Sequence, residues 1–272
     1  MNPNSKVWLC VVLLAIIGGL AIIHSMSGRD PMVPKQAPAT TAPPSSTARA
    51  SEVPARLASA AMASSPTLTN NAVNINAQVA GLLSEGNGAG LLAAHQIVAQ
   101  CLTIERLRRE GFRNPQVDKI HDERLKECSE LAYSYRRDYL SWLKRAIDQK
   151  VPGAAILFLS AGPNGNPDDL QFRASDPIVV EWKKTAIDYL IQAARNGEAP
   201  AALTLAQIYS TDAYGTPDAA LDIGYMMAMQ ELRRKNNQPV SEAISNHIKE
   251  KFKNLPPEEQ ARARLAASQI LN

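Results

Sequence analysis

Apolar residues recur at steps of three and four along most of the chain beyond residue 72, which is the spacing of a helix with one buried face. The clearest case is the stretch 189–209, where two such faces are separated by a turn at Gly197. Because that turn is short, the two helices must be antiparallel neighbours, and the alanines on both faces allow a close approach. We expect one helix to end near Gly197 and the next to begin near Ala199.

The chain also resembles itself at an offset of 47 residues. Trp142–Ile147 aligns with Tyr189–Ala194, and after a short polar turn Ala154–Leu159 aligns with Ala201–Ala206. Two similar helix–turn–helix units in tandem are typical of an α-solenoid.

Two further helices are predicted at the C-terminal end. The first covers 240–255, and the second begins at Pro256–Pro257, where prolines and acidic residues favour a helix start. We interpret this pair as a terminal repeat that caps the solenoid. The apolar stripe expected on the last helix consists of Leu265, Ala266, Ile270 and Leu271.

A cysteine-containing helical hairpin is predicted before the repeats. One helix covers Leu91–Glu110, and a second begins at Pro115 and is expected to continue to Gln149. Cys101 and Cys128 lie at similar depths, with a level difference of ~3 Å. In an oxidising compartment they would form a disulfide that contributes ~3–4 kcal/mol.

Two alternatives remain open for these cysteines. They could be two buried free thiols, or they could share a metal with His95 or His121, although the spacings match no standard ligand set. We predict no metal site, no cofactor and no catalytic residue. His121 is interpreted as an ordinary helix residue, because nothing in the sequence places a nucleophile beside it.

The N-terminal region is predicted to contain a targeting segment rather than a folded domain. Val7–Ile23 contains no charge and would span ~25 Å as a helix, near the short end for a bilayer crossing. Residues 1–29 are therefore predicted to be a signal anchor in a bacterial inner membrane, with the C-terminal part in the periplasm. Cleavage after Ser27, which would release a secreted or periplasmic protein, is the alternative.

Residues 30–71 contain seven prolines among Ala, Ser and Thr and almost nothing large and apolar. Such a segment cannot bury enough surface to offset its ordering entropy, so we predict a disordered linker.

The repeat region carries a family resemblance, through the pattern Ala-Ala-x-x-Gly-x-x-x-Ala-x-x-x-Leu-Ala-x-x-Tyr. It is met by Ala193, Ala194, Gly197, Ala201, Leu205, Ala206 and Tyr209. This resembles a Sel-one-like repeat, the bacterial relative of the tetratricopeptide (TPR) repeat. The match covers about Tyr189–Arg233, and in the earlier copy Lys150 replaces the turn glycine.

That resemblance implies an α/α right-handed superhelix whose concave face binds proteins or peptides, and it implies no catalytic residues. The predicted fold is therefore all-α: a helical hairpin (72–149) followed by a short solenoid of TPR-like repeats (150–272).

The net charge of the chain excludes few classes of partner. With 29 basic and 26 acidic residues, the net charge of +3 is too weak to indicate nucleic acid, and no nucleic-acid partner is predicted. Basic clusters such as 106–109 alternate with acids, so we interpret them as solvated faces with local ion pairs. An anionic ligand is the alternative.

The long connection 162–176 is the most loop-like polar segment of the folded part. Its paired carboxylates, Asp168 and Asp169, lack the alternating acids of an EF-hand, and we treat them as partner-contact candidates. Phe158 and Tyr214 are two further candidates.

The function expected from these features is a membrane-anchored periplasmic scaffold or adaptor that binds a protein or peptide partner. The oligomeric state is open. The alternatives are an envelope enzyme with a site near 162–176 and a structural protein that binds anionic cell-wall polymer or lipid.

Overall fold

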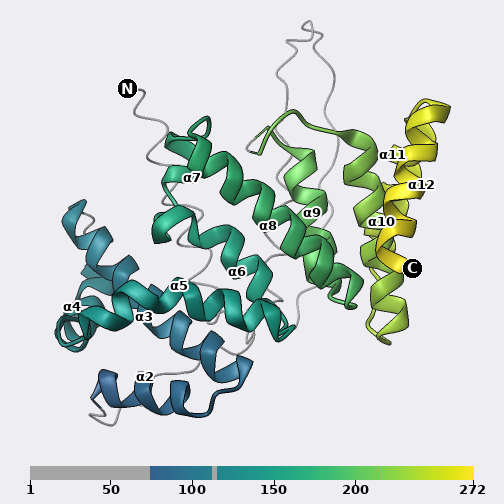
Figure 1. The fold of residues 1–272 in the computed structure, drawn as a ribbon. Coiled ribbons are helices and arrows are strands. Elements are labelled where there is room, and N and C mark those ends of the chain that lie inside the picture. The colour runs from purple at the N-terminus through teal and green to yellow at the C-terminus, as the bar shows by residue number, and fades with distance from the viewer. Residues whose placement is uncertain (1–73, 112–114, 213) are drawn as a thin grey trace, which may run out of the picture. The chain divides into compact units, whose positions relative to one another are not determined.

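The computed structural model describes residues 74–111, 115–212 and 214–272 (Figure 1). Every regular element in these ranges is helical, so the all-α prediction is confirmed there. The predicted signal anchor (1–29) and linker (30–71) lie outside the described residues. None of the described helices combines the length and apolar character needed to cross a membrane.

The helices follow one another with short connections. In chain order they are α2 (Ile75–Ser84), α3 (Gly88–Arg109), α4 (Pro115–Ser129), α5 (Tyr133–Asp148), α6 (Ala154–Ala161), the 3₁₀ turn η3 (Pro163–Gly165), α7 (Asp169–Phe172), α8 (Pro177–Arg195), α9 (Ala199–Ser210), α10 (Ala219–Lys235), α11 (Glu242–Asn254) and α12 (Pro257–Leu271). In the second half of the chain α6 packs on α5, α8 on α6, α9 on α8 and α10 on α9. The last helix, α12, packs on α10 (Figure 1).

The chain breaks between α4 and α5, so the prediction of one helix from Pro115 to Gln149 is wrong. The side chain of Asn76 on α2 forms hydrogen bonds to the backbone at this break. Its Nδ2 donates to the carbonyl oxygen of Glu130 at 2.7 Å, and its Oδ1 accepts from the backbone N–H of Ala132 at 2.9 Å. The amide of Asn76 thus satisfies backbone groups that a continuous helix would have paired within itself.

The predicted turn at Gly197 is present, and it is one of three helix ends with the same geometry. Two residues after their last helical residue, α5, α8 and α10 are each followed by a residue with left-handed backbone. These residues are Lys150 (φ 58°), Gly197 (φ 98°) and Asn237 (φ 53°). The next residue donates its N–H to a carbonyl in the last helical turn, as in a Schellman motif. The donor–acceptor pairs are Val151–Ala146 at 3.0 Å, Glu198–Ala193 at 3.1 Å and Gln238–Arg233 at 2.8 Å.

Lys150 therefore adopts the conformation of the glycine that it replaces in the earlier of the two copies related by 47 residues. The two copies also touch at their turns, because the Glu198 carboxylate accepts a hydrogen bond from the backbone N–H of Gly153 at 2.9 Å. Burial raises the pKa of Glu198 above its ordinary value.

The last helix presents the predicted face to the core except at one position. Ala266 and Ile270 are buried as expected, but Leu265 is 58% exposed, so its place in the stripe was wrong. α10 approaches α12 through Gly224, where a Cβ atom would lie 2.6 Å from the carbonyl oxygen of Ala263. Such a close approach requires small side chains at the point of contact, here Ala263 and Ala266. Leu265 is two residues after Ala263, about 200° around the helix, and therefore points away from this contact.

Candidate binding pocket

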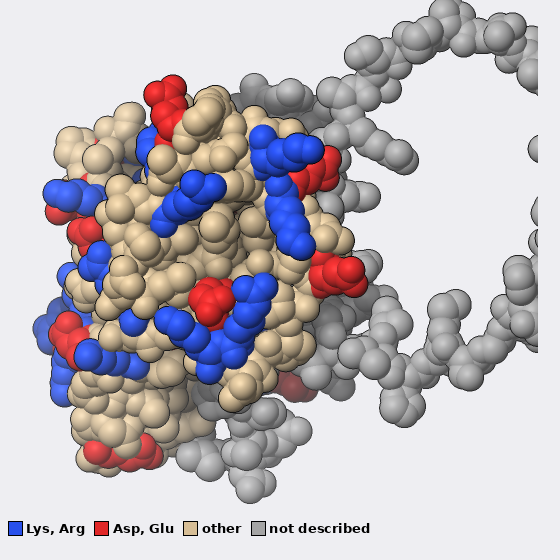
Figure 2. All heavy atoms as spheres, turned by 90° about the vertical axis from the view of Figure 1, so that its right-hand side faces the viewer, with Lys and Arg blue, Asp and Glu red and all other residues tan. Residues whose placement is uncertain are grey.

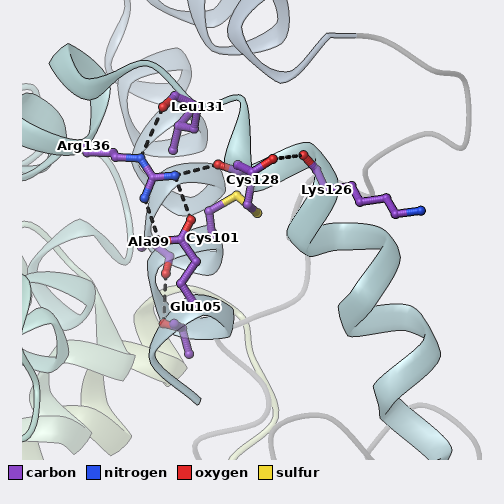
Figure 3. Close-up of a disulfide and its surroundings, with 9 residues drawn as sticks. Ala99, Cys101, Glu105, Lys126, Cys128, Leu131 and Arg136 are labelled. Carbon is purple, nitrogen blue, oxygen red and sulfur yellow. Dashed lines mark hydrogen bonds and ion pairs between the residues drawn. A yellow bond between two sulfur atoms is a disulfide. The ribbon is translucent and has the colours of Figure 1, made fainter. Parts of the chain in front are cut away.

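The helical hairpin is closed by a disulfide between Cys101 on α3 and Cys128 on α4 (Figure 3). The sulfur atoms lie 2.00 Å apart and the Cα atoms 5.3 Å apart, which confirms the predicted pairing. Both cysteines are buried. The bond fixes the C-terminal end of α4 against the middle of α3, across a sequence separation of 27 residues.

Arg136 on α5 ties the same region together. Figure 3 shows its guanidinium between Glu105 and the carbonyl oxygens of Cys128 and Leu131. Both carboxylate oxygens of Glu105 accept hydrogen bonds from it at 2.7 Å, and this pairing raises the pKa of Arg136. The charge of Arg136 is therefore balanced within the protein.

A cavity of about 710 Å³ lies beside this cluster, between α3, α5, α6 and the connection that follows α6. We call it the α3–α6 pocket. Its apolar lining consists of Ala99, Leu102, Leu157 and Ala161. Its charged lining consists of Arg106, Arg109, Arg136, Glu110 and Asp168. The other lining residues are His95, Thr103, Tyr139, Ser160, Asn164, Gly165, Asn166 and Pro167.

His95 forms a polar point in the wall of the pocket, although only 2% of it is exposed. Its ring stacks on that of Tyr139 with centroids 5.2 Å apart, and its Nδ1 lies 3.1 Å from the carbonyl oxygen of Tyr139. Burial lowers the pKa of His95 to about 4, so the ring is neutral at pH 7. The tautomer with a proton on Nδ1 is the one that can donate to that carbonyl. We assign His95 a structural role in joining α3 to α5.

The connection 162–176 is ordered rather than an open loop, and it forms one wall of the pocket. Asp168 accepts a hydrogen bond from Nη1 of Arg106 at 2.7 Å, which ties the connection to α3. Gly165 lies against α5, where a Cβ atom would be 1.6 Å from the hydroxyl oxygen of Tyr139. A side chain at position 165 would therefore displace the connection from α5.

The four partner-contact candidates from the sequence lie in different places. Asp168 lines the pocket. Asp169 is buried and accepts a hydrogen bond from Nδ2 of Asn166 at 3.0 Å, so it shapes the connection from within. Tyr214 is half-buried, with the Lys183 Nζ atom 5.1 Å from its ring centroid, and it does not line the pocket.

Phe158 is a core residue. It is 1% exposed, stacks on Trp182 with ring centroids 3.9 Å apart, and meets the edge of Tyr189 at 5.0 Å. A side chain enclosed in this way offers a partner no surface, so Phe158 is removed from the set of contact candidates.

Sequence reasoning missed Arg106 and Arg109 as pocket residues. The only available signal was the basic cluster 106–109, which we had interpreted as a solvated face. That interpretation fits other clusters better. On the α11–α12 side of the molecule, basic and acidic side chains lie intermixed (Figure 2). The ion pairs there include Lys251–Asp222 at 3.5 Å, Arg262–Glu259 at 2.8 Å and Arg234–Glu231 at 3.1 Å.

Among the residues that the structure describes, no group of three or more His, Cys, Asp or Glu side chains is placed to hold a metal ion. No family model, curated protein or solved structure matches the chain. The pocket and its surroundings are therefore the basis on which a function can be argued.

Proposed function

We propose that this protein is a helical scaffold that binds an extended segment of a partner protein in the α3–α6 pocket. The observation that carries this proposal is the pocket itself. Its volume of about 710 Å³ lies within the range of ~300–1,000 Å³ that is usual for binding sites. A lining that combines apolar with polar and charged side chains suits a segment that alternates apolar and polar side chains. Binding, and no catalysis, is proposed for this site.

The scaffold is proposed to be a short α/α solenoid of TPR-like repeats. This is supported by the two helix–turn–helix copies at an offset of 47 residues, by the shared geometry of their helix ends, and by the bond between their turns. Most helices pack on a helix one or two places away in the sequence, which is consistent with such a stack.

The proposed location is the periplasm, with residues 7–23 as the membrane anchor. The Cys101–Cys128 disulfide supports a compartment outside the cytoplasm, because thiols are kept reduced in most cytosols.

Photocrosslinking in cells of the organism that encodes the full chain tests the binding proposal. Ser160 is exposed at the rim of the pocket and is replaced by p-benzoyl-phenylalanine. We expect a crosslinked product with a defined protein, identified by mass spectrometry. A photoreactive group at this position would lie beside any segment that occupies the pocket.

Ser141 provides a matched control. It is also an exposed helical serine whose hydroxyl bonds to a carbonyl of its own helix, but it does not line the pocket. The proposal fails if position 160 yields no product, or if both positions yield the same products in equal amounts.

A further inference from the structure

Two arginines of α3 share one wall of the α3–α6 pocket. Arg106 and Arg109 are three residues apart and therefore lie on the same face of the helix. Arg106 donates from Nη1 to Asp168, which leaves its Nη2 edge open. Arg109 is exposed and has neither an ion pair nor a hydrogen bond with any residue in the described ranges. One whole guanidinium and part of another are thus available to a ligand.

The other charged groups of the pocket determine how many carboxylates this wall can bind. The charge of Arg136 is balanced by Glu105, and Asp168 accepts a hydrogen bond from Nη1 of Arg106. Glu110 also lines the pocket and places a negative charge next to Arg109. These charges cancel, so it is the open N–H groups of the two guanidiniums that can bind one carboxylate, whereas a run of acidic residues would meet Glu110 and Asp168.

The protein itself shows how a carboxylate binds there. Asp168 belongs to the non-helical connection along the pocket, and its carboxylate lies 2.7 Å from the Arg106 guanidinium. A segment of a partner protein that presents an acidic side chain one helical turn further along α3 would reach Arg109 in the same way.

The apolar lining residues Leu102 and Leu157, which we call the floor of the pocket, determine where a neighbouring side chain of the segment would lie. Leu102 lies four residues before Arg106 on α3, an axial rise of ~6 Å. In an extended peptide, side chains two positions apart point to the same side and are separated by ~6.6 Å. For a peptide that runs along α3, an acidic side chain beside Arg106 therefore places a side chain two residues away at the level of Leu102, while Arg109 lies on the far side of Arg106 from Leu102.

From this geometry, and resting on the function proposed above, we infer that the pocket selects an extended peptide segment with one acidic side chain two residues from one large apolar side chain. The acidic side chain binds Arg109 and the open edge of Arg106. The apolar side chain packs on the floor of the pocket.

Fluorescence anisotropy of labelled peptide pools with the oxidised full chain tests the inference. The octapeptides are blocked at both ends and contain one Asp and one Leu separated by one residue, in either order, within Ser, Thr and Gly. Matched pools carry Asn for Asp or Ala for Leu. We expect the Asp/Leu pool to bind about tenfold more tightly than either matched pool, since both contacts are then made. A second Asp next to the first should add less than about twofold.

The variant pair Arg109→Gln and Arg137→Gln separates pocket recognition from general charge. Arg137 is an exposed arginine of α5 that is paired with Asp138 and does not line the pocket. Arg109→Gln should reduce the preference for Asp over Asn to less than about twofold, whereas Arg137→Gln should keep it. Thermal melts of both variants check that each is folded.

Equal binding of the Asp and Asn pools to the wild-type chain would overturn the inference, as would an unchanged preference in Arg109→Gln or no binding at millimolar peptide. A crosslinked partner at position 160 together with any of these results would leave the proposed function standing and refute only the recognised chemistry. The absence of a crosslinked partner refutes the proposed function itself.

Discussion

The two ends of the described chain are stabilised by different means. Around α2–α5 the helices are joined by a disulfide and by polar side chains that bridge distant backbone groups, such as Asn76 and Arg136. Around α9–α12 they are joined by close contact of small residues, such as Gly224 against Ala263. The first region has long polar side chains near a cavity, and the second has tight apolar faces. Their different dependence on redox state, pH and side-chain volume makes the comparison testable.

Removing the disulfide should produce the largest effect, and only in the first region. The double variant Cys101→Ala/Cys128→Ala opens a loop of 27 residues, and we expect the free energy of unfolding to fall by about 3.5 kcal/mol. Urea denaturation of the oxidised proteins measures the loss.

Dithiothreitol serves as the control for that measurement. It should destabilise the wild-type chain by a similar amount and leave the double variant unchanged. A wild-type chain whose stability did not respond to the reductant would contradict the assignment.

Lowering the pH should destabilise the region around α2–α5, because His95 then becomes protonated. Because burial lowers the pKa of His95 from 6.5 to about 4, the folded state favours the neutral ring. Its contribution is complete above pH 6.5 and is lost as the pH falls toward 4, by about 3 kcal/mol in total. In His95→Gln this contribution is absent, so the stability advantage of the wild type should shrink by that amount between pH 7 and 4.

Chemical denaturation at several pH values provides the comparison. Parallel profiles for the wild type and His95→Gln would show that His95 is not buried as a neutral ring.

Adding one methyl group should break the second region selectively. In Gly224→Ala the new Cβ would lie 2.6 Å from the carbonyl oxygen of Ala263, so we expect a loss of about 2 kcal/mol from displaced helices. Gly81→Ala on α2 is the matched change, because a Cβ there meets nothing within 4 Å. It should stabilise the protein by about 0.5–1 kcal/mol through helix propensity. Thermal melts that gave both variants the same sign would contradict the close-contact account of α10 and α12.

The smallest expected effect lies at the boundary between the regions. Lys150 has a left-handed backbone that costs a non-glycine residue about 1 kcal/mol, so Lys150→Gly should stabilise the chain by about that amount. Lys184→Gly, in the exposed middle of α8, should destabilise it by a similar amount. The opposite signs of the two shifts in melting temperature are the result to look for.

The sequence predicted the second region better than the first because its signals are local. The turn at Gly197 and the helix start near Ala199 depend on residues within a few positions of one another. The break between α4 and α5 depends on Asn76, which is more than fifty residues away, and no local pattern reports it.

The pocket was difficult to predict for the same reason. Its wall is formed when Asp168 reaches Arg106 across a separation of 62 residues. The sequence did single out the connection 162–176 as unusual and Asp168 within it as a contact candidate, and both belong to the pocket. It could not show which of the basic clusters would face that connection, because this requires the register between α3 and α6.

The three matching helix ends in the described residues have a consequence for finding related helix–turn–helix units in other chains. Each needs a left-handed residue, and the chain uses lysine, glycine and asparagine at these positions. A search profile that demands glycine there would recover one of the three and discard the others. A profile that scores backbone conformation, and accepts any residue able to adopt it, would recover all three and would extend the search to distant chains whose turn residues have changed.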